Sequence, residues 1–160
     1  MELGVIIAIA GGAIATFLSG TGSAIGLGIA GRAASGVLSE DPTKFGRLFL
    51  LALLPSTQGL YGFIITLFVM MKLGMLGGGR VIPTTGEGWQ IFFATLPVAI
   101  SGLFSAIHQG KVCAAGIQMA AKQPGDVMKP VIYAVMVEMY AIIGFLVSLL
   151  FIMVGIKVGA

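Results

Sequence analysis

One carboxylate stands out among the residues that could do chemistry. Of the six acidic side chains, only Glu138 lies inside a long apolar run, which extends from residue 130 to 156. A charge at the centre of a membrane helix costs about 2.5–3.5 kcal/mol on insertion scales, and such acids are functional by default. We therefore expect Glu138 to bind and release a cation. The alternatives are a neutral, hydrogen-bonded structural glutamate and a side chain that reaches toward an interface.

Polar residues elsewhere in the chain offer partners for this carboxylate. The most polar patch of a second apolar run contains Thr57 and Tyr61, which are four residues apart and share one helix face. Gln58 lies on the adjoining surface, and Gln109 lies near the end of a third run. Pro55 lacks an amide hydrogen, so a backbone carbonyl loses its helical donor. Such oxygen ligands suit Na⁺, although a proton site needs only the acid, and helix–helix hydrogen bonding remains the alternative.

Four apolar stretches supply the elements that must position these groups. They cover residues 3–31, 48–71, 88–110 and 130–156, and each exceeds the roughly 20 residues that span a bilayer as a helix. The chain is 58% hydrophobic and only 9% charged, whereas a soluble domain is about a quarter charged. The first and third helices are expected to continue to about residues 38 and 121. The composition thus predicts an all-α membrane protein with four long transmembrane helices.

The connections between these helices indicate an orientation. Two short polar connections, 39–44 and 122–126, each contain a proline, and a longer glycine-rich one covers 74–87. More basic residues flank the short connections than flank the other side. They are Arg32, Lys44, Arg47, Lys111, Lys122 and Lys129, against Lys72, Arg80 and Lys157. The positive-inside rule predicts cytoplasmic short connections and both termini outside the cell.

The second half of the chain repeats the first half at a constant offset. Residues 19–20 match 101–102 as Ser-Gly, and 23–25 match 105–107 as Ser-Ala-Ile. Each unit contains two spans, so the copies run in the same direction, unlike an inverted transporter repeat. We predict two tandem-duplicated parallel hairpins, residues 1–78 and 79–160. The halves differ at one telling position, because Glu138 falls opposite Ser56.

Several other kinds of site are excluded or poorly supported. The net charge of +3 is too small and scattered for a nucleic-acid partner, and a single Cys113 excludes an internal disulfide. The glycines of residues 11–31 follow no predicted strand and precede no loop lysine, so they do not form a phosphate loop. They favour close helix packing instead, with an inner layer of the first and third helices. His108 by itself predicts no site beyond a packing or interfacial histidine.

The chain resembles the proteolipid rotor-ring subunit of V-type ATPases, called the K or c subunit, and especially its sodium-translocating bacterial form. The resemblance covers nearly the whole chain and includes the four helices, the direct duplication and a carboxylate in the fourth helix only. Its most specific segments are Leu-Leu-Pro-Ser-Thr-Gln-Gly-Leu-Tyr-Gly-Phe at 53–63, Gln-Gly-Lys-Val at 109–112 and Met-Val-Glu-Met-Tyr-Ala-Ile at 136–142.

The resemblance implies a Na⁺ ion between the second and fourth helices, next to the third. Glu138 matches the essential carboxylate of the family. The other matching positions are Thr57, Gln58 and Gln109 as side-chain ligands, Leu54 as a backbone carbonyl ligand, and Tyr61 as the residue that hydrogen-bonds the carboxylate and closes the site. Met139, next to the carboxylate, stands where a small polar residue is expected in some relatives.

The resemblance also implies an assembly in the cell membrane. Identical copies form a closed ring within the lipid, with the first and third helices inside, and the cytoplasmic loops contact a central stalk. Each Glu138 meets an essential arginine of a stator subunit, while ATP hydrolysis takes place in other subunits, so this chain is not itself an enzyme. The same rotor carrying H⁺ is the nearest alternative. A small four-helix cation-coupled antiporter fits the direct duplication and the long helices less well, and a purely structural channel or junction protein leaves the difference between Ser56 and Glu138 unexplained.

Overall fold

The computed structural model describes residues 2–77, 79 and 81–159, without the side chain of Pro124. The first hairpin contains α1 (Leu3–Glu40), the 3₁₀ turn η1 (Pro42–Lys44), α2 (Phe45–Leu53), the 3₁₀ turn η2 (Leu54–Ser56) and α3 (Thr57–Lys72). The second contains α4 (Thr85–Lys122), the 3₁₀ turn η3 (Pro124–Asp126), α5 (Met128–Leu150) and the π-helical turn η4 (Phe151–Gly155). The predicted boundary at residue 78 lies outside the described residues.

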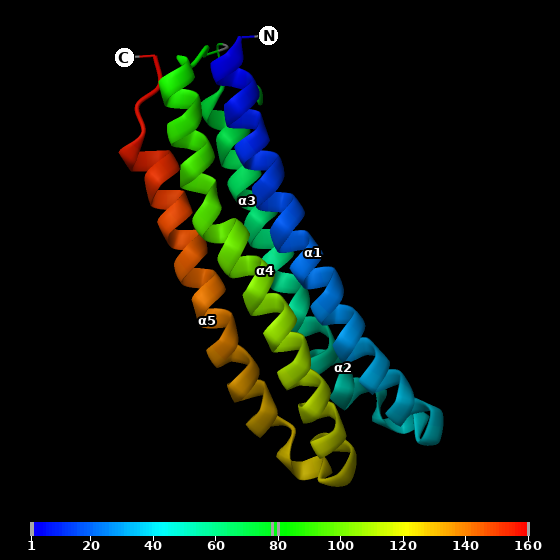
Figure 1. Ribbon diagram of the computed structural model, residues 1–160. Helices are drawn as coiled ribbons and strands as arrows, with labels where there is room; N and C mark the ends of the chain where they lie inside the picture. The colour runs from blue at the N-terminus through cyan, green and yellow to red at the C-terminus, as the bar shows by residue number, and fades with distance from the viewer. Residues whose placement is uncertain (1, 78, 80, 160) are drawn as a thin grey trace.

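The four helical columns run side by side, and the two hairpins point the same way. Figure 1 shows η1 and η3 at one end of the bundle and both termini at the other. The first and last residues of α4 are the repeat equivalents of the first and last residues of α1, and η3 matches η1 in the same way. The first helix and the connecting turn of the two hairpins therefore have equivalent bounds, whereas η2 interrupts the second column of the first hairpin and α5 runs unbroken from Met128 to Leu150. The predicted all-α fold with four long apolar helices is confirmed, and α1 and α4 end at Glu40 and Lys122, slightly beyond the expected positions.

The second helix begins earlier than its apolar run suggests. Its helical column starts at Pro42, six residues before the apolar stretch that begins at residue 48. Asp41 organises this start, because its carboxylate accepts hydrogen bonds from the hydroxyl and the amide of Thr43 at 2.6 and 3.1 Å. These bonds lower the pKa of the Asp41 carboxyl. Capping thus extends the helix into a region where hydropathy gave no signal.

Glycine allows α1 and α4 to approach along their length. A Cβ atom on Gly110 would lie 2.5 Å from the Cα of Gly26, and one on Gly22 would lie 2.6 Å from the Cα of Leu103. A Cβ atom this close to the opposite backbone would clash with it. Only glycine, which has no side chain, therefore fits at these two positions. α1 and α4 consequently form a tight central pair, with α3 packed mainly on α1 and α5 mainly on α4.

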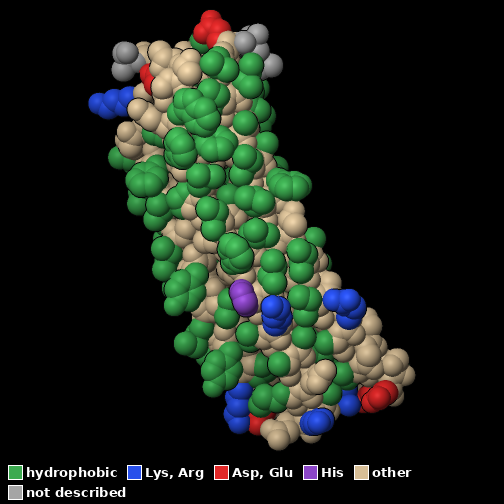
Figure 2. All heavy atoms as spheres, in the orientation of Figure 1, with side chains coloured by type: hydrophobic (Ala, Val, Ile, Leu, Met, Phe, Trp, Pro, Cys, Tyr) green, Lys and Arg blue, Asp and Glu red, His purple; other side chains and the backbone are tan. Residues whose placement is uncertain are grey.

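The interior consists of two apolar clusters with a polar layer between them. One cluster includes Ile65, Ile91 and Ile152, and the other includes Leu51 and Ile117. The buried polar side chains outside these clusters are Ser19, Ser23, Gln58, Thr95, Ser105, Gln109, Glu138 and Ser148. In the view of Figure 2, hydrophobic side chains cover most of the outer surface and acidic side chains gather at its two ends. Within the described residues, four helices are long and apolar enough to cross a membrane.

Replacing Gly110 with alanine tests the close approach of α1 and α4. The new methyl group would meet the backbone of Gly26, so we expect Gly110→Ala to destabilise the folded chain by about 1–3 kcal/mol. Gly36→Ala is the matched control, because nothing lies within 4 Å of that position. Thermal unfolding in detergent, followed by circular dichroism, measures both variants. Equal melting temperatures for the two would contradict the packing described above.

Candidate functional site

Glu138 lies midway along α5 and turns into the bundle. It is 7% exposed, and its helical neighbours on the same face, Ala134 and Ala141, are fully buried. The described residues contain two ion pairs, both near the short connections, and neither involves this carboxylate. A buried charge without a partner is costly, because desolvation is not offset by attraction. The carboxylate therefore requires either a cation or a proton.

Two neutral donors hold the two oxygens of this carboxylate. The hydroxyl of Tyr61, from α3, donates to Glu138 Oε1 at 2.7 Å. The amide of Gln109, from α4, donates to Glu138 Oε2 at 3.3 Å and to the backbone carbonyl of Ala134 at 3.0 Å. Tyr61 also packs on Phe145, with ring centroids 5.4 Å apart. Three helices thus meet at one side chain.

The two glutamines form the buried floor of the site. Gln58 and Gln109 are both fully buried, and the amide nitrogen of Gln58 donates to Gln109 Oε1 at 2.7 Å. The remaining oxygen, Gln58 Oε1, is buried without a hydrogen-bond partner among the described residues. Nearly all buried polar atoms in proteins are paired, so an unpaired oxygen within the network that holds a carboxylate is what a cation ligand would leave. The site is therefore suited to a cation that accepts oxygen ligands.

Thr57 and Leu54 form a separate pair at the break in the second helical column. The hydroxyl of Thr57 donates to the carbonyl of Leu54 at 3.1 Å, and the Thr57 amide bonds the same oxygen. Pro55 lies between them inside the 3₁₀ turn η2, where its missing amide breaks the α-helical ladder. The Leu54 carbonyl consequently remains within a locally bonded turn. Of the six residues singled out from the sequence, the structure joins Tyr61, Gln58, Gln109 and Glu138 in one network and leaves these two beside each other.

Two serines and one carbonyl support the site and were not expected from the sequence. Ser105 donates to the carbonyl of Val137, next to the carboxylate, at 2.9 Å. Ser23 accepts from the amide of Gly59, next to Gln58, at 2.8 Å. The carbonyl of Ala134 fixes Gln109 as described. Both serines belong to the internal repeat, and that pairing was the signal that could have drawn attention to them.

The repeat accounts for one such site in each chain. The network joins residues of the first hairpin to residues of the second. The constant offset of the repeat gives, for each of these residues, the equivalent position in the other hairpin. These are Tyr140 for Gln58, Leu27 for Gln109 and Ser56 for Glu138. Tyr140 is 71% exposed, and the Ser56 hydroxyl donates to its own helix at Leu53. The second set of positions carries no acid and no amide, so it offers no cation site.

The donor chemistry narrows the class of ion. No group of three or more His, Cys, Asp or Glu side chains gathers anywhere in the described part of the chain. His108 is exposed on α4, and Cys113 is buried in an apolar cluster. Amide, hydroxyl and carboxylate oxygens are hard ligands that suit alkali or alkaline-earth cations, whereas transition metals prefer imidazole and thiolate. With one carboxylate, the site matches a monovalent charge.

Comparison with known proteins agrees with this architecture. The family model that describes the C subunit of ATP synthase matches residues 4–69 and 92–151, once in each hairpin. V-type sodium ATPase subunit K of Enterococcus hirae is 46% identical over 150 residues, which cover 94% of this chain and 92% of that protein. A-type ATP synthase subunit K of Methanocaldococcus jannaschii is 35% identical over 154 residues, which cover 96% of this chain and 64% of that protein. The chain therefore belongs to the ATP synthase C-subunit family, in a duplicated form with two helical hairpins.

Proposed function

We propose that this chain is a non-catalytic rotor-ring subunit of a rotary ATPase and that Glu138 carries Na⁺ across the membrane. The main support is the buried carboxylate, which has no cationic partner among the described residues and belongs to a hydrogen-bond network that includes Gln58, whose Oε1 is unpaired. The similarity to a V-type sodium ATPase subunit K supports the choice of ion. Glu138, Gln109, Gln58 and Thr57, with the carbonyl of Leu54, form the proposed ligand set, and Tyr61 closes it.

The proposed ion site explains how a charge can move with the rotor. With Na⁺ bound, the carboxylate and the ion together carry no net charge, so the loaded site can face lipid. Release leaves the anion exposed to a stator subunit, where an arginine would stabilise it. A membrane potential acts on the moved charge with about 2.3 kcal/mol per 100 mV. The site must therefore bind Na⁺ tightly enough to load and weakly enough to release.

The connections and basic residues at the ends of the bundle indicate how the chain is oriented in the membrane and where its partner subunits bind. We propose that the two short connections, 39–44 and 122–126, face the cytoplasm and contact the central stalk, and that both termini face the outside. Most basic residues lie toward the end that carries these connections, which supports this direction. Identical copies form the closed ring, and lipid covers its outer surface.

Proton transport is the second candidate. The described geometry includes a direct hydrogen bond between Tyr61 and Glu138, which a protonated glutamic acid can also accept. A proton site, however, needs neither buried glutamine. The fully buried pair Gln58 and Gln109 favours Na⁺, because burying two amides without a ligand would leave an oxygen unpaired.

Carbodiimide modification of Glu138 distinguishes the two ions. The reagent reacts with a protonated carboxyl group. Bound Na⁺ keeps the Glu138 carboxylate unprotonated and should therefore protect Glu138 from labelling. We expect labelling at slightly alkaline pH to fall as Na⁺ is added and to be absent in Glu138→Gln. K⁺ at equal ionic strength serves as the control. Labelling that does not respond to Na⁺ would favour proton transport.

Replacing Gln109 tests its place in the ligand set. Gln109→Ala removes one bond to the carboxylate and one oxygen from the site, and a bond to a charged group is worth about 1.5–3 kcal/mol. We expect the Na⁺ concentration that gives half protection to rise about 10- to 100-fold. Gln118→Ala on the exposed face of α4 is the matched control. Unchanged protection in Gln109→Ala would remove this residue from the proposed ligands.

Replacing Tyr61 tests closure of the site. Tyr61→Phe keeps the packing on Phe145 but deletes the bond to Glu138 Oε1. We expect about tenfold faster release of Na⁺, measured as the rate of carbodiimide labelling after Na⁺ is diluted, since a bond to a charged group is lost. Tyr140→Phe, two residues from the carboxylate and 71% exposed, should leave this rate unchanged. Identical rates in both variants would contradict the closing role.

A further inference from the structure

The start of α3 is capped by a side chain from a different helix. α3 begins at Thr57, directly after the 3₁₀ turn η2, so the amide groups of its first turn have no acceptor within the helix. Ser56 occupies the N-cap position, but its hydroxyl donates backwards to the carbonyl of Leu53 at 2.7 Å. The amide of Gly59, the third residue of α3, therefore needs an acceptor from another part of the molecule.

Ser23 on α1 supplies that acceptor. Its hydroxyl oxygen accepts a hydrogen bond from the Gly59 amide at 2.8 Å, and the side chain is only 8% exposed. The two backbones approach closely here, because a Cβ atom on Gly59 would lie 3.4 Å from the Cα of Gly20. Pro55 packs on the same helix, since a Cβ atom on Gly26 would lie 2.9 Å from the Pro55 Cβ. α1 thus supports both the break in the second column and its restart.

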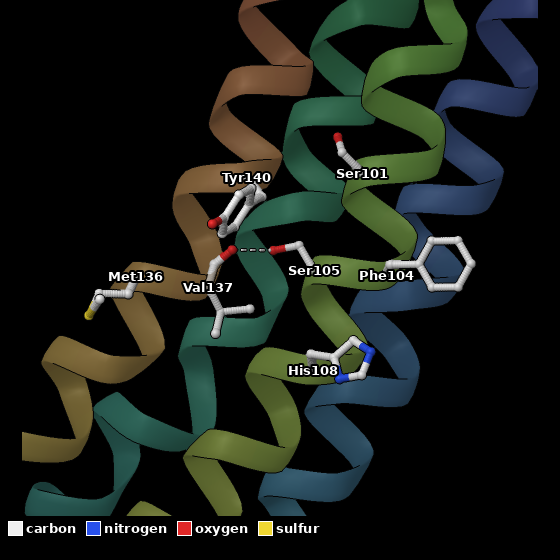
Figure 3. A pocket seen from close by; sticks show the side chains of 7 residues that line it. All are labelled: Ser101, Phe104, Ser105, His108, Met136, Val137 and Tyr140. Carbon is white, nitrogen blue, oxygen red and sulfur yellow. Dashed lines mark hydrogen bonds between the residues drawn. The ribbon is translucent and has the colours of Figure 1, made fainter.

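The equivalent serine of the second hairpin bonds in the opposite sense. Ser105, the repeat partner of Ser23, donates to the carbonyl of Val137 at 2.9 Å, and the dashed line in Figure 3 marks this bond. The repeat partner of Gly59 is Ala141, which lies within the unbroken helix α5. Its amide is already used in the helical bond to the Val137 carbonyl. The break in the first hairpin therefore frees an amide that the second hairpin keeps in its helix.

The bond to Ser23 keeps the 3₁₀ turn η2 from rewinding. Without the Ser23 oxygen, the nearest acceptor for the Gly59 amide is the carbonyl of Pro55, four residues earlier. That bond would extend α3 backwards and change η2 toward α-helical geometry, which has more residues per turn. The side chain of Gln58 and the carbonyl of Leu54 would then point in new directions. Both groups belong to the proposed ligand set.

We propose that Ser23 is a positioning residue for the ion site, because its cap holds η2 and the ligands beside it in the orientation that binds Na⁺. This inference rests on the proposed function and adds a residue outside the ligand set. Gln58 shows why orientation matters. Its amide nitrogen donates to Gln109 at 2.7 Å, and its Oε1 has no partner among the described residues. A rotation at the start of α3 would move both atoms at once.

Removing the two equivalent hydroxyl groups should have unequal effects. Ser23→Ala leaves a buried amide without an acceptor, which is costly, whereas Ser105→Ala leaves the Val137 carbonyl with its helical donor. We expect the Na⁺ concentration that gives half protection from carbodiimide to rise about tenfold in Ser23→Ala. The rise in Ser105→Ala should be less than about threefold. Ser23→Thr keeps the hydroxyl acceptor and should retain most of the parent affinity.

Two further measurements distinguish positioning from a general loss of stability. Ser19→Ala is the matched control, because Ser19 is also buried on α1 but donates to the carbonyl of Val98 on α4 at 3.0 Å. It should leave the Na⁺ concentration for half protection unchanged. The rate of labelling without Na⁺ should be the same in Ser23→Ala and the parent, since the carboxylate keeps its bonds from Tyr61 and Gln109.

The outcomes separate this inference from the proposed function. A weaker response to Na⁺ in Ser23→Ala, with an unchanged rate in its absence and retention in Ser23→Thr, supports the positioning role. An unchanged response in Ser23→Ala would overturn that role and leave Na⁺ transport standing. So would an equal loss in Ser19→Ala, Ser105→Ala or Ser23→Thr. Labelling of the parent that does not respond to Na⁺ would contradict the proposed ion itself, and the positioning role with it.

Discussion

A carboxylate buried without a cationic partner among the described residues is the constraint on which the rest of this structure depends. Glu138 is 7% exposed, and the groups that touch it, Tyr61 and Gln109, are neutral donors. Neutral donors orient the carboxylate and lower the cost of burial, but they leave its charge uncompensated. A fixed arginine or lysine at this place would hold the carboxylate permanently and prevent exchange. A carboxylate held by neutral donors alone leaves the compensating charge to a mobile ion, as the proposed function requires.

Close helix packing makes this arrangement possible. Glycine contacts between α1 and α4 bring the backbones together, and the polar layer lies between two apolar clusters that exclude water. The 3₁₀ turn η2 ends at Ser56, directly before Thr57, in the same column that carries Gln58 and Tyr61. Because the turn changes the local helical repeat, it sets the direction in which these side chains project. Packing, rather than any single bond, thus fixes the distances at the site.

Duplication gives the chain two similar hairpins with different tasks. The bounds of α4 and η3 are the repeat equivalents of those of α1 and η1, and the serines that support the site belong to both copies. The proposed ligands, however, lie where the first hairpin contacts the second, and their repeat equivalents Tyr140, Leu27 and Ser56 carry no acid and no amide. The duplicated chain therefore provides one set of proposed ion ligands for its two hairpins.

The sequence by itself determined the four membrane helices, the direct repeat and the identity of the one carboxylate in the membrane, because hydropathy and periodicity are properties of the chain alone. It also indicated which residues could surround Glu138. Only the tertiary structure decided that Gln109 bonds Glu138 and Ala134, that Gln58 keeps an unpaired oxygen, and that Thr57 bonds Leu54. The physical reason is that an amide or hydroxyl has several possible partners within reach of its helix. Helix rotation and approach distance select among them, and both are set by glycine contacts between residues far apart in the chain.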